Sequence, residues 1–288
     1  EHLMLAPLDN ETIFKTAFTD KTVFKSFVRD ILGIEIEVAK IETEKKFKPK
    51  VGQIDITLDI FAESVDHRVV IEIQRVDYDY NFDRFLHYFM MAIAQMQGSS
   101  NEYAIDRTVY SIIVLTAPYK MDQKKQKSIK DDVLITSLDP RNLDDKVVEI
   151  YGHKLIFLNH YYRNKNTPTN YRDWMDLIYE SINNPENYKV NLEHEGIKKA
   201  VELIEYDHLT GEQLHQMKIA TQRKVMRRID HDQAMQEGIE IGVKKGKREG
   251  KREGKIETAK KMLKKGYSIE TIVDLTGLKS SDIENLQK

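Results

Sequence analysis

Apolar residues recur at helical spacing in two segments of the first hundred residues. In residues 11–32 they fall three or four positions apart, and Gly33 follows the last of them, as at many helix ends. Residues 80–97 carry a second stripe of the same kind. The first stripe consists of Phe14, Phe18, Phe24, Phe27, Val28, Ile31 and Leu32, and the second of Phe82, Phe85, Leu86, Phe89, Ile93 and Met96. The spacing predicts a helix over each segment.

Alternation of apolar and polar residues predicts strands between and after these helices. Residues 34–47 alternate loosely, and residues 52–61 and 68–75 alternate strictly. Residues 108–116 have the composition of a buried strand, and residues 147–158 predict a further hairpin. The amino-terminal half of the chain therefore predicts an order of helix, three strands, helix and strand.

The two strictly alternating segments carry the candidate chemistry. Successive side chains of a strand point to opposite faces. Asp55 and Asp59 are therefore expected on one face of the first strand, opposite the apolar set Ile54, Ile56, Leu58 and Ile60. In the second strand Glu72 and Gln74 share a face with Val70, opposite Val69, Ile71 and Ile73.

A short polar loop over residues 63–67 makes these two strands a hairpin, in which Asp55 and Glu72 are expected side by side. Two neighbouring carboxylates repel each other unless a cation lies between them, and Mg²⁺ prefers such oxygen ligands. Asp59 is the alternative ligand on the same face. The contrary interpretation is that Asp55 and Glu72 are solvated strand residues, one of which pairs with Arg84.

From Tyr171 onward the pattern is helical, with breaks near Asn184-Pro185 and Thr210-Gly211. Glycine then recurs every four residues, at Gly238, Gly242, Gly246, Gly250 and Gly254. Each glycine costs a helix roughly 1 kcal/mol relative to alanine. Two interpretations remain open: a helix that needs a partner for close packing, or a low-complexity linker.

The last segment, residues 256–287, predicts short helices. Ala259, Met262 and Leu263 are expected to begin a helix that ends at Gly266, and Ser268 is expected to cap the next one. A turn at Thr276-Gly277-Leu278 leads to a last helix, so the segment resembles a helix-turn-helix. That last helix is poor in basic residues, which favours a small packing module over a reader of DNA bases.

Composition excludes several classes of function. The chain of 288 residues contains no cysteine, so disulfides, cysteine–zinc sites and thiol nucleophiles are excluded. No apolar stretch approaches the ~18 residues that span a bilayer, and a cytoplasmic protein without a membrane partner is expected.

Charge is unevenly distributed along the chain. The net charge is −2, but residues 244–265 contain eleven Lys or Arg and three Glu, a local charge of +8. This stretch, called the basic segment below, is a candidate for binding a polyanion through Lys244, Lys245, Lys247, Arg248, Lys251 and Arg252. A solvated helix is the alternative interpretation.

The spacing Asp55-(x16)-Glu72-x-Gln74 resembles the PD-(D/E)XK nuclease motif, in the form found in the recombination-promoting nuclease (putative transposase) family. Three further features match that family in order along the chain. They are the opening segments 9–18 and 28–33, the pair Arg84 and Tyr88 on the following helix, and the glycine-rich tail with its final helices. The resemblance covers most of the chain.

The resemblance implies an α/β fold, with a restriction-endonuclease-like core in which helices flank a mixed sheet, and a helical carboxy-terminal region. The expected divisions are residues 4–165 for the nuclease-like core and 166–234 for a helical extension. Residues 235–255 follow as the glycine repeat and residues 256–288 as the small helical module.

The resemblance also implies roles for the site residues. Asp55 and Glu72 are the expected ligands of Mg²⁺, with Mn²⁺ as a substitute, and Gln74 is expected to orient a water molecule. Most of the superfamily has lysine at the position of Gln74, and an amide cannot supply the positive charge of an ammonium. Arg84 is expected to contact phosphate and Tyr88 to hydrogen-bond a ligand or the substrate. The first helices offer a further acid that the sequence does not single out among Asp9, Glu11, Asp30 and Glu35.

Two functions follow from these features. The first is a Mg²⁺-dependent DNA endonuclease linked to recombination, mobile elements or phage defence, which forms a homo-oligomer through its carboxy-terminal region. The second is a nuclease fold of weak or no activity that serves as a nucleic-acid-binding or oligomerisation module.

Overall fold

The computed structural model describes residues 3–48, 55–74, 82–97, 104–119 and 129–287. The chain forms two compact units, Glu1–Lys224 and Val225–Lys288.

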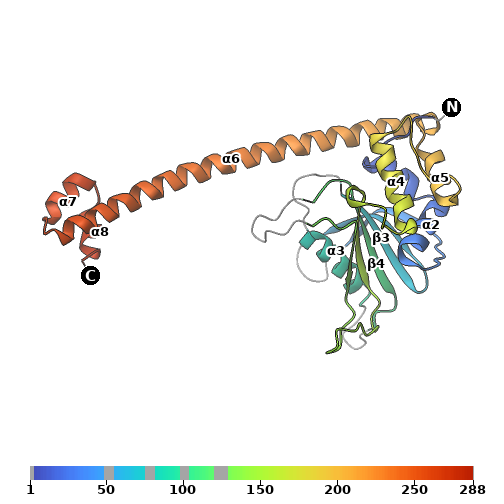
Figure 1. The fold of residues 1–288 in the computed structure, drawn as a ribbon, viewed down its shortest axis with the longest axis horizontal. Coiled ribbons are helices and arrows are strands. Elements are labelled where there is room, and N and C mark those ends of the chain that lie inside the picture. The colour runs from blue at the N-terminus through green and yellow to red at the C-terminus, as the bar shows by residue number, and fades with distance from the viewer. Residues whose placement is uncertain (1–2, 49–54, 75–81, 98–103, 120–128, 288) are drawn as a thin grey trace. The chain divides into compact units, whose positions relative to one another are not determined.

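A six-stranded mixed sheet forms the centre of the first unit (Figure 1), and its strand order is β1-β2-β3-β4-β6-β5. β1, β2 and β3 are antiparallel, β4 and β6 run parallel to β3, and β5 is antiparallel to β6. The strands are β1 (Ile41–Phe47), β2 (Ile56–Glu63), β3 (His67–Gln74), β4 (Thr108–Leu115), β5 (Val133–Ser137) and β6 (Lys154–Asn159). The predicted α/β class with a mixed central sheet is confirmed.

The burial and charge of the side chains fit the position of each strand, central or at the edge of the sheet. Every residue of β3 from Arg68 to Gln74 is buried, as expected of a central strand covered on both faces. The edge strand β1 carries two Glu and two Lys among its seven residues. Charges at a sheet edge discourage pairing with another chain.

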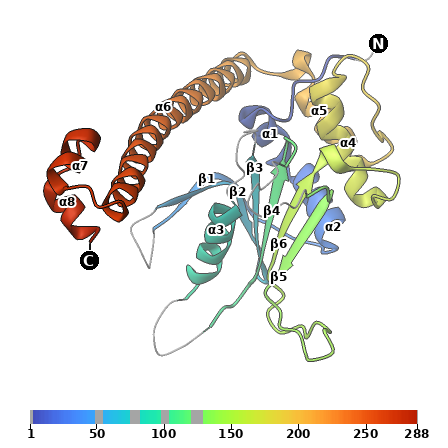
Figure 2. The same cartoon turned by 60° about the vertical axis from the view of Figure 1, so that its left-hand side comes forward.

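Helices cover both faces of the sheet (Figure 2). On one face α3 (Phe82–Ala94) packs through Phe85 and Phe89 against apolar residues of β2, β4 and β6. The other face is covered by a larger core to which four helices contribute. These are α1 (Glu11–Phe18), α2 (Lys21–Leu32), α4 (Thr169–Asn183) and α5 (Glu195–Ile204). The sheet is therefore buried between two separate apolar layers.

The helix predicted over residues 11–32 is two helices, because the chain contains a second amino-terminal cap. The side chains of Asn10 and Asp20 each accept two backbone N–H groups in the first turn of α1 and α2, respectively. Gly33 ends α2 with a φ of 68°, a left-handed conformation that glycine adopts without a steric penalty. The resulting turn at Thr19 lets α1 and α2 pack on the sheet separately.

The structure corrects two predicted boundaries in this unit. Only the second half of residues 34–47 is a strand, and residues 80 and 81 of the predicted helix lie outside the described residues. The hairpin predicted within residues 147–158 is instead formed by β5 and β6. Its connecting loop is held by Asp139, whose carboxylate accepts the amide N–H groups of Ile150, Tyr151 and Gly152 at 3.0, 2.6 and 3.1 Å.

The remaining helical elements complete the carboxy-terminal half. Two short 3₁₀ helices, η1 (His160–Tyr162) and η2 (Tyr206–His208), precede α4 and α6. The break predicted near Asn184 is confirmed by the end of α4, and the break predicted at Thr210 by the start of α6 (Gly211–Lys264). The first turns of α6 belong to the first unit, where Asn10 donates a hydrogen bond to the Met217 carbonyl at 3.0 Å.

The second unit consists of the rest of α6, α7 (Ile269–Thr276) and α8 (Ser280–Asn285). The glycine row lies inside α6, and a Cβ atom added at any of its five positions would meet nothing within 4 Å. Ala259 and Leu263 belong to the last turns of α6 and do not begin a new helix. Ser268 caps α7 as predicted, and Gly277 ends it with a φ of 64°.

A small core joins α6 to α7 and α8 through Ala259, Ile272, Leu278 and Ile283. Among the described residues, no helix combines the length and the hydropathy that a bilayer crossing requires.

Candidate functional site

The candidate site lies where β2 departs from regular strand geometry, at Asp59. Leu58 and Phe61 belong to the apolar layer under α3, whereas Ile60 and Ala62 belong to the layer under α1 and α2. Leu58 and Ile60 would share one face in a regular strand, so the facing of the strand changes between them. This corrects the prediction that Ile56, Leu58 and Ile60 point the same way; Ile54 lies outside the described residues.

The neighbouring strand is irregular at the same level. Glu44 on β1 has a φ of 52°, which is uncommon for a residue with a side chain. It lies between Thr43, paired with Ile60, and Lys45, paired with Leu58, and therefore faces Asp59. Because of these two irregularities, the side chains of Glu44 and Asp59 do not follow the alternation of faces in an ordinary sheet.

Asp59 and Glu72 hold each other through the backbone of the opposite strand. The Asp59 amide donates to Glu72 Oε1 at 3.0 Å, and the Ile73 amide donates to Asp59 Oδ2 at 3.1 Å. These bonds follow directly after Ile60–Ile71, the last regular pair of β2 and β3. Carboxylates thus take the place of backbone carbonyls, and both side chains are held at the point where the two strands separate.

Burial and mutual repulsion make this pair of acids reluctant to ionise together. Burial raises the pKa of Glu72 well above the ordinary carboxyl value, and the nearby charge of Asp59 raises it further. Burial also raises the pKa of Asp59, against the opposing effects of the Ile73 amide and the charge of Lys15. A cation that approached both carboxylates would reverse these shifts.

Helix α1 brings Glu11 and Lys15 to the same place. Glu11, Glu44 and Asp59 each have a carboxylate oxygen within 4.8 Å of the others. The Lys15 ammonium is 2.7 Å from Glu11 Oε1 and also binds Glu44. Burial lowers the pKa of Lys15, but its hydrogen bonds to Glu11 and Glu44 and the charge of Asp59 outweigh this and raise it.

Helix α3 contributes to the site from the other face of the sheet. Arg84 donates a hydrogen bond to Gln74 Oε1, and its guanidinium lies 5.9 Å from the centre of the Tyr88 ring. The charge of Arg84 opposes the upward shift in the pKa of Glu72. Burial raises the pKa of Tyr88, and the charges of Glu72 and Asp59 add to that shift. Arg84 therefore links Gln74 on β3 to Tyr88 on α3.

The backbone of β3 is anchored where the site begins. Thr116, directly after β4, donates its amide and its hydroxyl to the Gln74 carbonyl at 3.1 and 3.0 Å. The Gln74 side chain is 8 % exposed and the Glu72 side chain 6 %. Both are thus presented from a rigid strand.

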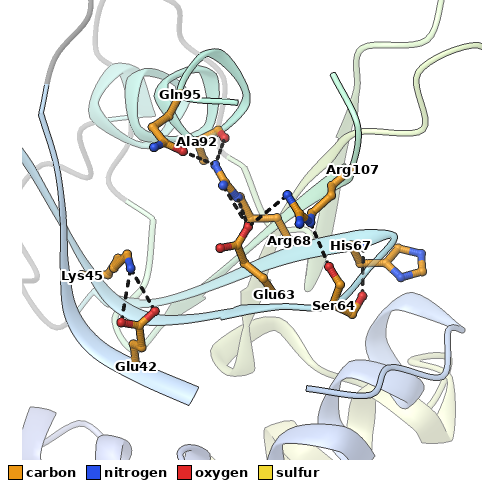
Figure 3. A network of polar contacts seen from close by, with 9 residues as sticks. All are labelled: Glu42, Lys45, Glu63, Ser64, His67, Arg68, Ala92, Gln95 and Arg107. Carbon is orange, nitrogen blue, oxygen red and sulfur yellow. Dashed lines mark hydrogen bonds and ion pairs between the residues drawn. The ribbon is translucent and has the colours of Figure 1, made fainter. Parts of the chain in front are cut away.

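A second polar network lies at the opposite end of β2 and β3, next to their turn (Figure 3). The guanidinium of Arg68 donates to Glu63 Oε2 at 3.1 and 2.9 Å, and to the Ala92 carbonyl and Gln95 Oε1 at 2.8 and 2.9 Å. Because Ala92 is near the end of α3, these bonds tie α3 to β3. The network helps to set the position from which α3 presents Arg84 and Tyr88.

The structure places Asp59, and not Asp55, opposite Glu72, and the ligand role of Asp55 stays a prediction. Asp55 is exposed and precedes β2, outside its pairing with β3. The reason lies in hairpin geometry, since residues pair when they are equally distant from the turn. Asp59 lies five residues before Ser64 and Glu72 five after His67, the two residues that close the turn with a 2.8 Å hydrogen bond.

Among the acids left open near the first helices, the structure brings Glu11 to the site. Asp30 instead accepts hydrogen bonds from Trp174 Nε1 at 2.8 Å and His194 Nε2 at 2.6 Å, and Asp9 pairs with Lys224 at 3.1 Å. Glu44 and Lys15 were not found from the sequence. Lys15 lies one helical turn after Glu11, and this spacing could have predicted that the two side chains lie together. Glu44 reaches the site through an irregularity of β1 that no sequence pattern predicts.

The basic segment lies in the second unit. The side chains of Lys244, Lys245, Lys247, Arg248, Lys251 and Arg252 are all exposed on α6. Lys245 makes an exposed pair with Glu249 at 3.9 Å. The predicted polyanion surface is therefore accessible in the described structure.

The acidic site has the donors that a hard divalent cation requires. Glu11, Glu44 and Asp59 offer carboxylate oxygens from α1, β1 and β2, with Glu72 of β3 beside Asp59, and carboxylate oxygen is the ligand type of Mg²⁺ and Mn²⁺. The cluster of Glu11, Glu44 and Asp59 beside Glu72, and the Lys15 ammonium bound to Glu11 and Glu44, indicate a site with a surplus of negative charge. The residues present fit such an ion.

Comparison with known families agrees with this geometry. A family model described as "PD-(D/E)XK nuclease family transposase" matches residues 11–237, which include every residue of the acidic site. No curated protein and no solved structure gives a significant match. The resemblance seen in the sequence motifs is confirmed by the family match. Because the matched region covers most of the chain, the protein belongs to the PD-(D/E)XK nuclease family transposases.

Proposed function

We propose that this protein is a Mg²⁺-dependent DNA endonuclease in which Asp59 and Glu72 are the central metal ligands. The observation that carries the proposal is the pair of reciprocal bonds between Asp59 and Glu72, which hold two partly or wholly buried carboxylates together at the point where β2 and β3 separate. Family membership supports a nuclease, and the cluster of acids supports the metal. Asp59 takes the role that the sequence motif suggested for Asp55.

The ligand set extends to neighbouring elements. Glu11 from α1 is the proposed third ligand, and Glu44 completes the cluster of carboxylates around it. When bound, the divalent ion would activate water and stabilise negative charge on the attacked phosphate. Hydrolysis adds the oxygen of water to phosphorus and breaks the bond to the leaving oxygen, which receives a proton.

The remaining side chains orient the reactants. Gln74 is held by Arg84 through its amide oxygen, so its NH₂ group is left to hydrogen-bond the attacking water. The Arg84 guanidinium is the proposed phosphate contact, because its fork of donors suits phosphate oxygens. Tyr88, one turn further along α3, is proposed to hydrogen-bond the substrate or a metal ligand.

The most direct assay uses supercoiled plasmid with and without Mg²⁺. The proposal predicts that the protein nicks or linearises the plasmid only with the metal, and that Glu72→Gln abolishes this activity. Metal-independent nicking, or nicking by Glu72→Gln at the wild-type rate, would refute it. Replacing the plasmid with single-stranded RNA tests the preference for DNA.

One observation favours the second function, a nuclease fold used only for binding. The Lys15 ammonium binds the carboxylates of Glu11 and Glu44, as expected of a site closed by internal ion pairs. Calorimetric titration distinguishes the two functions: an active site binds Mg²⁺, whereas a closed one takes up none up to millimolar concentration.

A further inference from the structure

Lys15 occupies an unusual position for a lysine at a helix surface. Its side chain is 15 % exposed, and its ammonium binds Glu11 and Glu44 while its charge acts on Asp59. Lys25 on the next helix shows the ordinary arrangement, since it pairs with Glu37, a side chain that is 89 % exposed. Lys15 is therefore directed at the acidic site and not at solvent.

An open hollow gives access to the same ammonium. Its volume is about 630 Å³, and it lies against α1, β1 and the first turns of α6. Lys15, Glu11 and Glu44 line it, together with the hydroxyl groups of Thr12 and Thr16 and the side chain of Arg223. A substrate group entering this hollow would reach Lys15 together with the carboxylates of Glu11 and Glu44.

Phosphodiester hydrolysis at this site requires a positively charged side chain near the phosphate. Charge that develops on an attacked phosphate is stabilised by cations aimed at its oxygens. Gln74 cannot supply positive charge, so the cations of this site must come from other elements: Arg84 on α3, which binds Gln74, and Lys15 on α1. An ammonium from α1 would provide this charge without requiring any lysine on β3.

We propose that Lys15 is the catalytic ammonium of the nuclease site, contacting the substrate phosphate in the role that a lysine at position 74 would otherwise have. This inference rests on the proposed nuclease function. Under this proposal α1 contributes two groups to the site: the metal ligand Glu11 and, one turn later, the ammonium of Lys15. Glu44, held at its positive φ, keeps the ammonium beside Asp59 until substrate and metal are bound.

The test compares Lys15→Met, Gln74→Lys and the double variant at saturating Mg²⁺. Lys15→Met is expected to cleave plasmid about 100-fold more slowly than wild type, as for loss of one group that stabilises the transition state. Gln74→Lys in the same chain is expected to recover at least about tenfold, because it restores the ammonium from β3. The matched control, Lys25→Met, is expected to cleave at the wild-type rate.

A merely structural ion pair would give a different pattern. In that case Lys15→Met would lower the melting temperature, and Gln74→Lys would not restore cleavage. A wild-type rate for Lys15→Met, or a slow double variant beside an active Gln74→Lys single variant, overturns the proposal.

Metal binding provides a readout that does not depend on cleavage. Removing a positive charge beside the ligands is expected to tighten Mg²⁺ binding several-fold in Lys15→Met, measured by calorimetry, and to leave it unchanged in Lys25→Met. If the wild-type protein failed to cleave DNA, the proposed function would fail, and this titration would still test the placement of Lys15. An unchanged Mg²⁺ affinity in Lys15→Met would overturn that placement.

Discussion

The two ends of the β2–β3 hairpin both bury charge, but they do so in opposite ways. Near the turn, Arg68 is 5 % exposed and its guanidinium is matched by Glu63, the Ala92 carbonyl and Gln95. At the other end, Glu72 is 6 % exposed and its nearest charged neighbour on the facing strand is another acid, Asp59.

This difference separates a structural role from a functional one. Burying a charge is costly unless partners neutralise it and satisfy its hydrogen bonds. The Arg68 end meets both conditions with protein groups alone. The Asp59 end satisfies some of its hydrogen bonds through backbone amides but accumulates like charge, so a ligand from outside the chain would stabilise it. Perturbed pKa values of this kind are typical of functional sites.

The largest effect is expected from removing charge at the acidic end. Glu72→Gln should reduce Mg²⁺-dependent plasmid cleavage by at least about 1000-fold, because a central ligand is lost. The melting temperature in metal-free buffer should equal or exceed that of wild type, because the amide does not repel Asp59. Glu42→Gln, on β1 outside the site, serves as the control. A large loss of stability in Glu72→Gln would contradict the comparison.

At the turn end the expectation is reversed. Arg68→Met should lower the free energy of unfolding by about 3 kcal/mol, because Glu63 and the end of α3 lose a buried partner. Urea unfolding measures this. Arg107→Met removes a partly exposed arginine 3.7 Å from Glu63 and should cost less than about 1 kcal/mol. Equal losses in the two variants would show that the Arg68 network is not the buried support described here.

A second contrast, between the acidic body and the basic segment, concerns DNA binding. Truncation after Asp232 removes the glycine row, the basic segment and the final helices. The affinity for DNA should fall about tenfold, and log affinity should depend less steeply on log salt concentration, because fewer phosphates are neutralised. Fluorescence anisotropy at several salt concentrations measures both.

Light scattering of the full-length and truncated proteins tests the accompanying proposal of self-association through the carboxy-terminal region. The mass per particle should fall by more than the deleted residues account for. Identical oligomeric states would favour a linker. Since all proposed ligands precede Tyr88, the truncated protein should still cleave at high concentration.

The pH dependence of stability gives a smaller effect. Folding raises the pKa of both Asp59 and Glu72, so the folded chain binds these protons more tightly than the unfolded chain does. The contribution of this pair to stability in metal-free buffer should therefore be greatest below the ordinary carboxyl pKa and should decrease as pH rises through the raised pKa values. The groups around the pair are Glu11, Lys15, Glu44, Arg84 and Tyr88.

Calorimetric melting between pH 4 and 8 should show this decrease as a shift of a few degrees. Saturating Mg²⁺ should offset it at neutral pH, and Glu72→Gln should flatten it. If the melting temperatures of wild type and Glu72→Gln both rose as the pH increased from 4 to 8, the raised pKa values would be contradicted.

Much of the fold could be predicted from residue patterns, because each element is amphipathic in its own period. The apolar stripe from Phe82 to Ile93 predicted α3, and strict alternation predicted β2 and β3. The split between α1 and α2 depended on a single capping residue, Asp20, which apolar spacing does not register. The β5–β6 pairing depended on a loop held by Asp139, a contact between residues far apart in the chain.

For the site, sequence reasoning identified Glu72, Gln74, Arg84 and Tyr88 as candidates and ranked Asp55 above Asp59. Counting outward from the turn would have placed Asp59 against Glu72 without a structure. Glu44 and Lys15 could not be found in the same way, because one depends on a distorted strand and the other on how α1 lies over the sheet. Local patterns predict which residues form a helix or a strand, whereas the meeting of four elements is a property of the packed chain.

The most direct test of the central claim compares the two aspartates of the first strand. Asp59→Asn and Asp55→Asn make the same chemical change four residues apart, one inside the acidic pair and one exposed before β2. Mg²⁺-dependent cleavage of supercoiled plasmid should be lost in Asp59→Asn, by at least about 1000-fold, and should stay within about twofold of wild type in Asp55→Asn. Loss of cleavage in Asp55→Asn with wild-type activity in Asp59→Asn would contradict the account.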